Sequence, residues 1–372
     1  MELALILLAV FAALVTAAVL CDAVPALCTW LRRIGIGSLP LQTAREKMRA
    51  AAARMLRHTP AVPVSDQTRF TLPERLKGTY KSRKVQSWQK AALLLGAAES
   101  GNDAAVTACR SDLLAADGTW KKPVGRVDEA LLAYALLRSA NDAQAVRPAM
   151  DEMYALLTAQ ASDGTVPYDP HAAGRRYVDT VGMICPFLWL YGKTYDVPQA
   201  KELCMRQLYE YKTCGLHPVT GLPAHAFRLS DGAALGIGDW GRGCGWYALA
   251  LSELLRCGAD VNEDAVQFAH AVIPLQQENG AWSRQLLSER GIESTATAML
   301  GHLCAVLFAA TQDAQYEAAA GKAQRALLSA TRKNGETDFA QGDTKSIGFY
   351  SVRLTAVPAA TGFALLLTEE LR

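Results

Sequence analysis

Two aspartates stand just ahead of strongly apolar segments and could act as acids or bases. Asp128 lies in the stretch Arg126-Val-Asp-Glu-Ala-Leu-Leu132, and Asp179 lies in Tyr177-Val-Asp-Thr-Val-Gly-Met183. One explanation is helix capping, because an aspartate at a helix start accepts hydrogen bonds from unpaired amides and suits the helix dipole. Capping suffices for either residue alone. It leaves unexplained why both acids open successive helical hairpins at equivalent ends, where a closed ring would aim them at one mouth.

A third unusual stretch combines glycines with two tryptophans and an arginine. It reads Asp239-Trp-Gly-Arg-Gly-Cys-Gly-Trp246, and His225 lies fifteen residues before Trp240. Three glycines within five residues predict a loop or a strained helix entrance. The stretch lacks the GxxxxGK[ST] pattern of a phosphate-binding loop. An indole face beside a guanidinium suits a flat anionic ring such as a uronic acid, although core packing and a salt bridge would account for the single residues.

A recurrent glycine turn sets the predicted architecture. Each copy follows a segment with helical apolar periodicity and precedes an aromatic, β-branched or other apolar residue. The turn glycines are separated by 46, 57, 59 and 55 residues, enough for two helices and two loops per unit. Lys77-Gly-Thr79 resembles a degenerate first copy. The glycines are Gly118, Gly164, Gly221, Gly280 and Gly335.

This repeat predicts about six helical pairs over residues 40–372. A single pair is too short to bury its apolar face alone, so the pairs must stack on one another. They can form an open solenoid or close into an all-α (α/α)6 toroid. Turns interleaved with Trp and His favour closure around a pocket, because an open array need not gather aromatic residues and carboxylates at its loop ends.

The N-terminus carries an uncharged apolar run from Leu3 to Cys21, which is long enough to cross a bilayer. We expect one membrane helix within an anchor and linker at residues 1–39. A cleaved signal peptide is the alternative, but no Lys or Arg precedes the run and no clear cleavage site follows it. Because Arg32 and Arg33 follow the run, the positive-inside rule places the domain of residues 40–372 in the cytoplasm.

The composition narrows the remaining possibilities. The chain has 372 residues, of which 51% are hydrophobic and 20% charged, with a formal net charge of +2. This composition is typical of a packed globular protein, and no basic stripe indicates nucleic-acid binding. Nine cysteines, an odd number without CxxC pairs, favour free thiols in a reducing compartment. No Cys or His pair has the spacing of a zinc site, so we expect no zinc. The sequence leaves the oligomeric state open.

Four motifs taken together resemble the unsaturated glucuronyl and rhamnogalacturonyl hydrolases, glycoside hydrolase families 88 and 105. The resemblance spans about residues 70–372 and implies an (α/α)6 barrel that acts inside the cell on oligosaccharides left by polysaccharide lyases. The motifs are Asp179-Thr-x-x-Met183, Trp240-x-Arg242-Gly-x-Gly-Trp246, Asn279-Gly-x-Trp282 and Glu293-Ser-Thr-Ala-Thr-Ala-Met299.

The same resemblance implies roles for individual residues. Asp179 would be the general acid and base, and Asp128 the second essential carboxylate. Asp179 would protonate C4 of a C4=C5 double bond, water would add at C5, and the resulting hemiketal would open to release the partner sugar. This reaction would require no metal or cofactor. The predicted sugar-site residues are His225, Trp240, Arg242, Trp246 and Met183, with His171 as the approximate match to another family histidine.

The sequence departs from the family pattern at three positions. Cys244 stands where Asn is common, Gly182 where a bulky residue is usual, and Tyr177 where Trp is frequent. These departures affect the expected substrate more than the chemistry. Two other hypotheses stay open: another (α/α)6 glycosidase with an ordinary Asp128 and Asp179 acid-base pair, and a membrane-tethered helical-repeat protein that binds without catalysis.

Overall fold

Six helices pack side by side in an inner ring, and six more lie outside it. The computed structural model describes residues 2–63, 81–82, 86–344 and 346–372. Neighbouring inner helices contact each other around the ring, and the last contacts the first. The inner helices are α4 (Gln86–Glu99), α6 (Ala130–Arg138), α8 (Val178–Thr194), α10 (Gly241–Arg256), α12 (Ser294–Thr311) and α14 (Pro358–Glu370). The outer helices are α2 (Leu41–Arg57), α5 (Asp103–Leu113), α7 (Arg147–Gln160), α9 (Pro198–Gly215), α11 (Asn262–Val272) and α13 (Ala314–Ser329).

Burial distinguishes the two layers. In α10 every side chain from Gly241 to Leu254 is buried, whereas α5 buries only Val106 and Cys109. A helix that is enclosed on all sides must be apolar around most of its circumference, while an outer helix needs one apolar face. The predicted (α/α)6 toroid is confirmed.

Closure of the ring depends on a close approach between its first and last inner helices. A Cβ atom at Gly96 in α4 would lie 2.4 Å from the carbonyl oxygen of Gly362 in α14. Any side chain at this position would therefore push the two helices apart. The pair of glycines lets the sixth hairpin pack directly on the first.

The five predicted glycine turns each join an outer helix to the following inner helix. Their glycines all have positive φ angles, from 68° to 86°, which favour glycine over other residues. The last turn also closes the outer layer, because a Cβ at Gly335 would lie 2.1 Å from the carbonyl oxygen of Lys47 in α2. The predicted repeat is thus present at all five turns. The degenerate copy at 77–79 lies outside the described residues.

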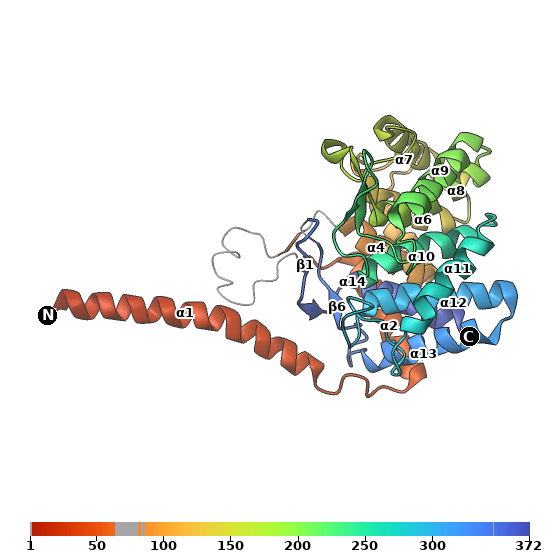
Figure 1. Ribbon diagram of the computed structural model, residues 1–372. Coiled ribbons are helices and arrows are strands. Elements are labelled where there is room, and N and C mark those ends of the chain that lie inside the picture. Colours follow the sequence, from red (N-terminus) through yellow and green to blue (C-terminus); the bar gives the residue numbers. More distant parts are fainter. Residues whose placement is uncertain (1, 64–80, 83–85, 345) are drawn as a thin grey trace.

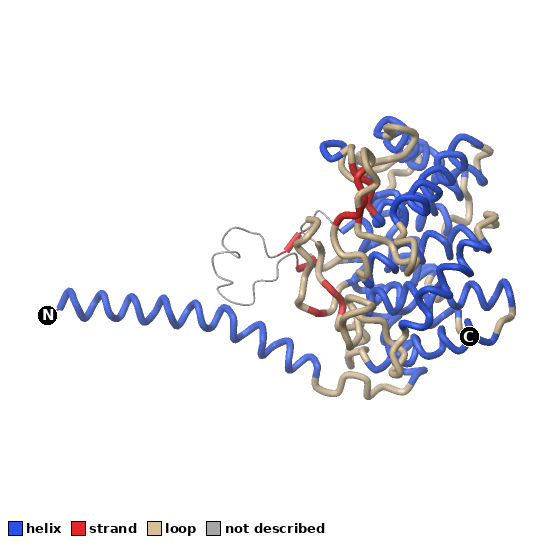
Figure 2. The backbone as a smooth tube through the Cα atoms, in the orientation of Figure 1, coloured by secondary structure: helices blue, strands red, loops and turns tan. Residues whose placement is uncertain are grey.

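Short strands and long connections gather where the inner helices begin, an end that we call the mouth (Figures 1 and 2). One antiparallel sheet has the order β3-β4-β5, with Arg175 opposite Arg228, and β6 pairs with β7, with Ala340 opposite Thr355. The strands are β1 (Val62–Pro63), β2 (Lys81–Ser82), β3 (Arg175–Tyr177), β4 (Ala226–Arg228), β5 (Ala234–Leu235), β6 (Ala340–Gln341) and β7 (Leu354–Thr355). Short 3-10 helices are η1 (Val127–Glu129), η2 (Gln144–Val146), η3 (Pro170–Ala172) and η4 (Ile273–Leu275).

The predicted membrane segment lies within α1 (Glu2–Arg33), which leaves the barrel on the side of the mouth (Figure 1). Two described helices, α1 and α12, are long and apolar enough to cross a membrane. Helix α12 is mostly buried in the barrel, whereas the apolar window of α1 is 0% buried. Helix α1 continues twelve residues beyond the apolar run, so part of the expected linker is helical.

Candidate active site

A cavity of about 240 Å³ opens at the mouth between the starts of the inner helices. Five of the predicted site residues line it: Asp179, Met183, His225, Arg242 and Trp246. The fold therefore brings residues from three separate segments of the sequence into one cavity. The remaining lining residues are Trp88, Tyr168, Asp169, Tyr177, Asp343, Thr344, Ser346 and Ile347.

Asp179 does not cap its helix. The N-cap position of α8 is Tyr177, and no side chain makes a capping hydrogen bond there. The Asp179 side chain is 14% exposed, and its Oδ2 lies 3.2 Å from His225 Nε2. Helix capping, the simplest alternative to a chemical role, thus does not explain this carboxylate.

A short hydrogen-bond chain orients His225. The backbone N–H of Ile237 donates to the Tyr350 hydroxyl oxygen at 3.0 Å, and the same hydroxyl lies 2.6 Å from His225 Nδ1. When the Tyr350 O–H donates to Nδ1, Nε2 carries a proton and can donate it to Asp179. The imidazole is thereby oriented with Nε2 toward Asp179 Oδ2.

Asp128 also makes no cap. The neighbouring Glu129 accepts from the backbone N–H groups of Gly125 and Arg126, at 2.7 and 2.9 Å, and so performs that role. Asp128 is 1% exposed; its Oδ1 accepts from Arg126 Nε at 2.7 Å, and its Oδ2 has no partner among the described residues. Burial raises the pKa of Asp128, although the Arg126 guanidinium opposes the shift.

Tyr168 connects Asp128 with the cavity. Burial raises the pKa of this lining tyrosine, and the negative charges of Asp128, Asp179 and Asp343 raise it further. The phenol is therefore influenced by the charges of three carboxylates, of which Asp179 and Asp343 line the cavity and Asp128 does not. Neutral Tyr168 can donate one hydrogen bond to this acidic group.

Arg242 contributes a guanidinium group to the cavity lining. It is 2% exposed, and its Nη1 donates to the carbonyl oxygens of Gln341 and Gly342, both at 2.8 Å. The guanidinium carbon lies 5.0 Å from the centre of the Trp240 ring and 5.9 Å from that of Trp88. Nη2 and Nε make no hydrogen bond within the described residues. A fixed guanidinium with two unused donor nitrogens can hold a carboxylate.

Trp240 does not line the cavity but packs against two residues that do, Arg242 and His225. It is buried, its Nε1 donates to Gln341 Oε1 at 2.7 Å, and its ring lies 4.6 Å from that of His225. The indole thus positions Arg242 and His225. Trp246, in contrast, lines the cavity and packs edge-on against Trp88 at 5.3 Å.

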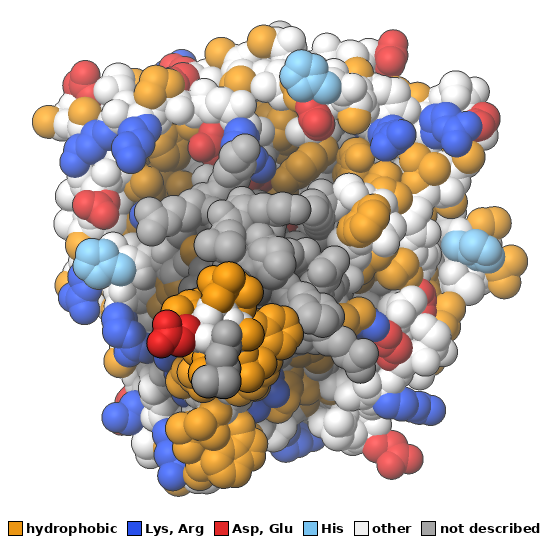
Figure 3. Space-filling model, turned by 90° about the vertical axis from the view of Figure 1, so that its left-hand side faces the viewer, with side chains coloured by type: hydrophobic (Ala, Val, Ile, Leu, Met, Phe, Trp, Pro, Cys, Tyr) orange, Lys and Arg blue, Asp and Glu red, His pale blue; other side chains and the backbone are white. Residues whose placement is uncertain are grey.

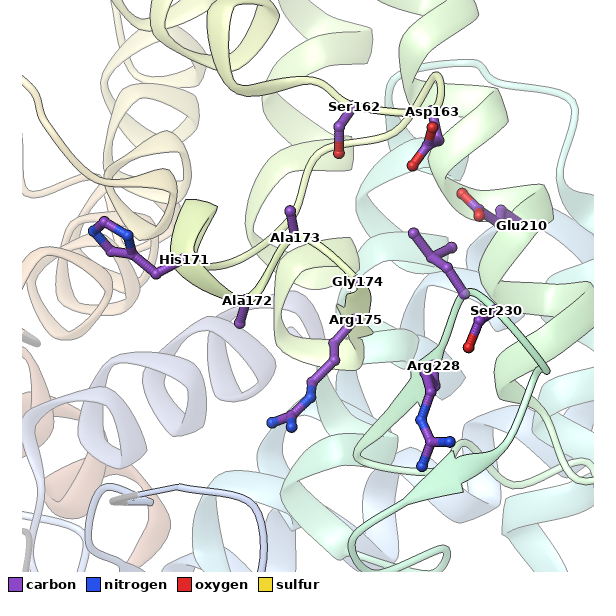
Figure 4. A pocket seen from close by; sticks show the side chains of 11 residues that line it. Ser162, Asp163, His171, Ala172, Ala173, Gly174, Arg175, Glu210, Arg228 and Ser230 are labelled. Carbon is purple, nitrogen blue, oxygen red and sulfur yellow. The ribbon is translucent and has the colours of Figure 1, made fainter.

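His171 lies apart from the cavity. It belongs to η3 and lines a separate surface pocket of about 1020 Å³, together with Arg175, Glu210 and Arg228. Figure 4 shows its ring directed away from Ser162 and Asp163 at the far side of that pocket. The structure therefore does not place His171 beside Asp179, although only eight residues separate them in the sequence.

Comparisons with known proteins agree with this fold. Residues 121–370 match the sequence profile of Glycosyl Hydrolase Family 88, about two thirds of the chain. The chain belongs to glycosyl hydrolase family 88. It is accordingly a glycoside hydrolase. No curated protein matches the sequence.

Solved structures resemble this family 88 chain over most of its length. A possible member of family 105 from Salmonella enterica serovar Paratyphi A has a TM-score of 0.69 and 18% identity, covering 88% of this chain and 93% of that one. The unsaturated glucuronyl hydrolase of Bacillus sp. GL1, described as degrading glycosaminoglycan, has a TM-score of 0.63 and 18% identity, covering 88% and 96%. An unsaturated glucuronyl hydrolase specific for heparin gives 0.65 and 16%, covering 89% and 95%. At these identities the likeness shows the fold.

One departure of this family 88 chain has a structural reason. A Cβ at Gly182 would lie 2.6 Å from the carbonyl oxygen of Trp246. The glycine lets α8 approach α10, which brings Asp179 and Trp246 to the same cavity. Tyr177 contacts the edge of His225, with ring centres 5.5 Å apart, and Cys244 is fully buried.

The sequence prediction missed several lining residues, of which Asp343 is the most important. Burial raises the pKa of Asp343 to about 6; Arg242 opposes this shift, while Asp179 and Asp128 add to it. Asp343 follows β6 in an irregular connection, so no periodic pattern marked it. Trp88 and Tyr168 were missed for a similar reason, since neither belongs to a recognisable motif.

Proposed function

We propose that this enzyme removes a 4,5-unsaturated uronic acid from oligosaccharides produced by polysaccharide lyases. The observation that carries the proposal is the cavity that holds Asp179, backed by His225, together with the partly unpaired guanidinium of Arg242. An acid and a carboxylate-binding cation within one small cavity fit a substrate that has both a reactive double bond and a carboxylate. The similar solved structures named as unsaturated glucuronyl hydrolases support this choice.

In the proposed reaction Asp179 donates a proton to C4, and the electron pair of the C4=C5 bond forms the new C–H bond. Positive charge then develops at C5 and is shared with the ring oxygen. Water adds at C5 and returns a proton to Asp179. The hemiketal so formed opens and releases the partner sugar. Asp179 thus serves as acid and then as base.

The surrounding residues would each support one part of this sequence. Arg242 would hold the substrate carboxylate, and Trp246 and Met183 would pack against the ring. His225 would orient Asp179 through its Nε2–H. Asp128 would contribute a second carboxylate behind Tyr168, where its negative charge favours the developing positive charge at C5.

The ordinary acid-base pair of other (α/α)6 glycosidases is the rival mechanism. Such a pair flanks the glycosidic bond from two sides and needs both carboxyl groups to reach the substrate. Asp179 lines the cavity, whereas Asp128 is 1% exposed and does not. This difference favours a mechanism that uses one carboxyl group directly.

The test is a set of unsaturated disaccharides made by lyases from pectin, glycosaminoglycans and other uronate polymers. We expect the ultraviolet absorbance of the conjugated double bond to fall with time for at least one of them. Asp179→Asn should lower kcat by about 10²–10⁴-fold, the usual contribution of a general acid or base. Asp313→Asn is the matched control, because Asp313 does cap a helix and precedes α13, outside the cavity.

Two results would contradict the proposal. Hydrolysis of saturated glycosides, with no activity on any unsaturated disaccharide, would favour the ordinary glycosidase pair. Full turnover of an unsaturated disaccharide by Asp179→Asn would remove Asp179 from the role of acid.

We also propose that α1 anchors the enzyme in a membrane, with the barrel in the cytoplasm. The support is its fully exposed apolar window and the cations Arg32 and Arg33 at its C-terminal end. A reporter fused after residue 40 should report a cytoplasmic location, and the intact mass should include α1. An extracellular signal, or a mature chain that lacks α1, would overturn this part of the proposal.

A further inference from the structure

One mouth loop connects the anchor helix with the catalytic cavity. The loop comprises residues 346–355, and its Tyr350 hydroxyl contacts His225. Four residues further on, the carbonyl oxygen of Leu354 accepts from Arg33 Nη2 at 2.8 Å. The C-terminal end of α1 is therefore fixed to the same loop that closes the site.

Arg33 holds this end of α1 firmly. Its Nε and Nη2 donate to the two carboxylate oxygens of Asp338, each at 2.9 Å, and its guanidinium lies 4.5 Å from the centre of the Phe339 ring. The backbone N–H of Gly37 then donates to the carbonyl oxygen of Thr331 at 2.9 Å. A bidentate ion pair with further contacts on both sides fixes direction as well as position.

The length of α1 sets the height at which the membrane surface meets the barrel. Its 32 residues span about 48 Å at the usual helical rise, close to the full thickness of a bilayer with headgroups. Trp30, 62% exposed, lies one turn before the end, where tryptophans gather at membrane interfaces. If α1 crosses the bilayer, Arg33 therefore lies at headgroup level, and so does the adjoining mouth.

The mouth also carries exposed apolar side chains. Beyond residue 41, five large hydrophobic side chains are classed as exposed within the described part of the chain, and three of them belong to two mouth loops. Those three are Leu287, Phe349 and Val352, 58%, 68% and 56% exposed. The two loops adjoin, because Arg284 Nη1 donates to the carbonyl oxygen of Ser351 at 3.3 Å. We call Leu287, Phe349 and Val352 the rim.

We propose that the rim contacts the headgroup region of the bilayer that α1 enters, so that the catalytic cavity opens toward the membrane surface. Figure 3 looks onto this face, with α1 directed toward the viewer and with both basic and acidic side chains around its edge. Exposed apolar side chains that gather on one face are typical of surfaces that bind membranes or partners. The proposal rests on the proposed membrane insertion of α1.

The test uses the full chain reconstituted in phosphatidylcholine vesicles, some of which carry a nitroxide quencher on the lipid headgroup. Because the chain has seven tryptophans, the difference in quenching between wild type and Trp30→Phe reports the insertion of α1. Phe349→Trp adds a fluorophore at the rim, and we expect most of the added fluorescence to be lost to the quencher. Tyr209→Trp is the matched control, because Tyr209 is 52% exposed on the outer helix α9. Its added fluorescence should remain.

The two outcomes separate the anchor from its orientation. Absence of this difference between wild type and Trp30→Phe would contradict insertion of α1, whereas its presence with equal signals from positions 349 and 209 would overturn the rim contact alone. Arg33→Gln in the Phe349→Trp background should reduce the added quenching and leave that of Trp30 intact. Arg32→Gln, the adjacent cation, should change neither. Activity on soluble disaccharides tests the catalytic proposal separately.

Discussion

Charged side chains are buried at both ends of this barrel, but they are paired very differently. At the end opposite the mouth, His302 lies between two carboxylates, with Nε2 at 2.6 Å from Glu253 and Nδ1 at 2.5 Å from Glu370. Glu253 also accepts from the Tyr134 hydroxyl and pairs with Arg138 at 3.4 Å. These residues come from α6, α10, α12 and α14, so the cluster joins four inner helices.

The pKa values of the buried acids at the two ends are shifted in opposite directions. Burial alone would raise the pKa of Glu253, but Arg138 and the hydrogen bond from His302 hold it well below its usual range. At the mouth, burial prevails and raises the pKa of Asp128 and Asp343. A buried charge with matched partners locks helices together, whereas a buried acid with too few partners is prepared for proton transfer. We therefore expect substitutions of the buried acids at the mouth to reduce activity, and substitutions in the cluster at the opposite end to reduce stability.

Asp128→Asn should give the largest effect on activity after Asp179→Asn. The amide keeps the shape of the side chain but removes a negative charge near Tyr168, so we expect kcat to fall by about 10²-fold, the usual order for loss of one electrostatic contribution. Thermal unfolding should change by less than about 2 °C, because the carboxylate has an unpaired oxygen and gains little from burial. Steady-state kinetics and thermal unfolding measure the two effects. A variant that unfolds readily and keeps its kcat would place Asp128 with the paired charges.

Glu253→Gln should show the opposite behaviour. It removes the buried carboxylate that His302, Tyr134 and Arg138 share and leaves Arg138 paired with Glu99 alone. We expect a loss of about 3–5 kcal/mol in the free energy of unfolding. Urea denaturation measures this loss, and kcat of the folded fraction should stay near that of wild type. Glu317→Gln, on the exposed face of α13, is the control for the loss of one carboxylate. Unchanged stability of Glu253→Gln would show that the cluster does not hold the helices.

Arg242→Lys tests whether Arg242 holds the substrate carboxylate in the cavity. Lysine keeps the charge but loses the planar arrangement that holds two backbone carbonyls and still offers free donors. We expect KM to rise by about tenfold, equivalent to about 1.4 kcal/mol, with a smaller change in kcat. Michaelis kinetics on the best disaccharide measure both values. The exposed Arg228→Lys should leave them unchanged, and an unchanged KM for Arg242→Lys would mean that Arg242 does not hold the substrate.

The regular parts of the fold could be predicted from the sequence because they repeat. The glycines of the five turns recur at nearly constant intervals, and each needs a positive φ that few other residues adopt. Asp179 stands in the first turn of an inner helix, and the starts of the inner helices converge once the ring is recognised. His225, Arg242 and Trp246 were predicted for the same site through the family resemblance, and His225 lies in the connection before α10.

Residues in irregular segments could not be placed in this way. Asp343 and Tyr168 enter the cavity from long connections whose course depends on distant contacts, such as the hydrogen bond between Arg242 and Gln341. His171 was predicted for the sugar site as the approximate match to a family histidine, but in the structure it lines a separate pocket. The cluster around His302 was also missed, since its members are spread over more than 200 residues and form no motif.

Substitution of Asp343 should give the smallest effect. It tests directly whether a buried carboxyl group at the mouth changes its charge near neutral pH. Its pKa is raised to about 6, so the side chain is neutral below that pH and becomes charged beside Arg242 as the pH rises through it. A charged Asp343 competes with the substrate carboxylate for Arg242, so KM should rise by roughly threefold between about pH 5 and about pH 7. Folding stability should fall as the pH rises from about 4, the ordinary pKa of an aspartate, to about 6, because the folded state favours the protonated form. Asp343→Asn should flatten both profiles, and Asp231→Asn, at an exposed loop position, should not. A wild-type KM independent of pH, or an Asp343→Asn profile identical to that of wild type, would mean that Arg242 is not shared between this carboxylate and the sugar.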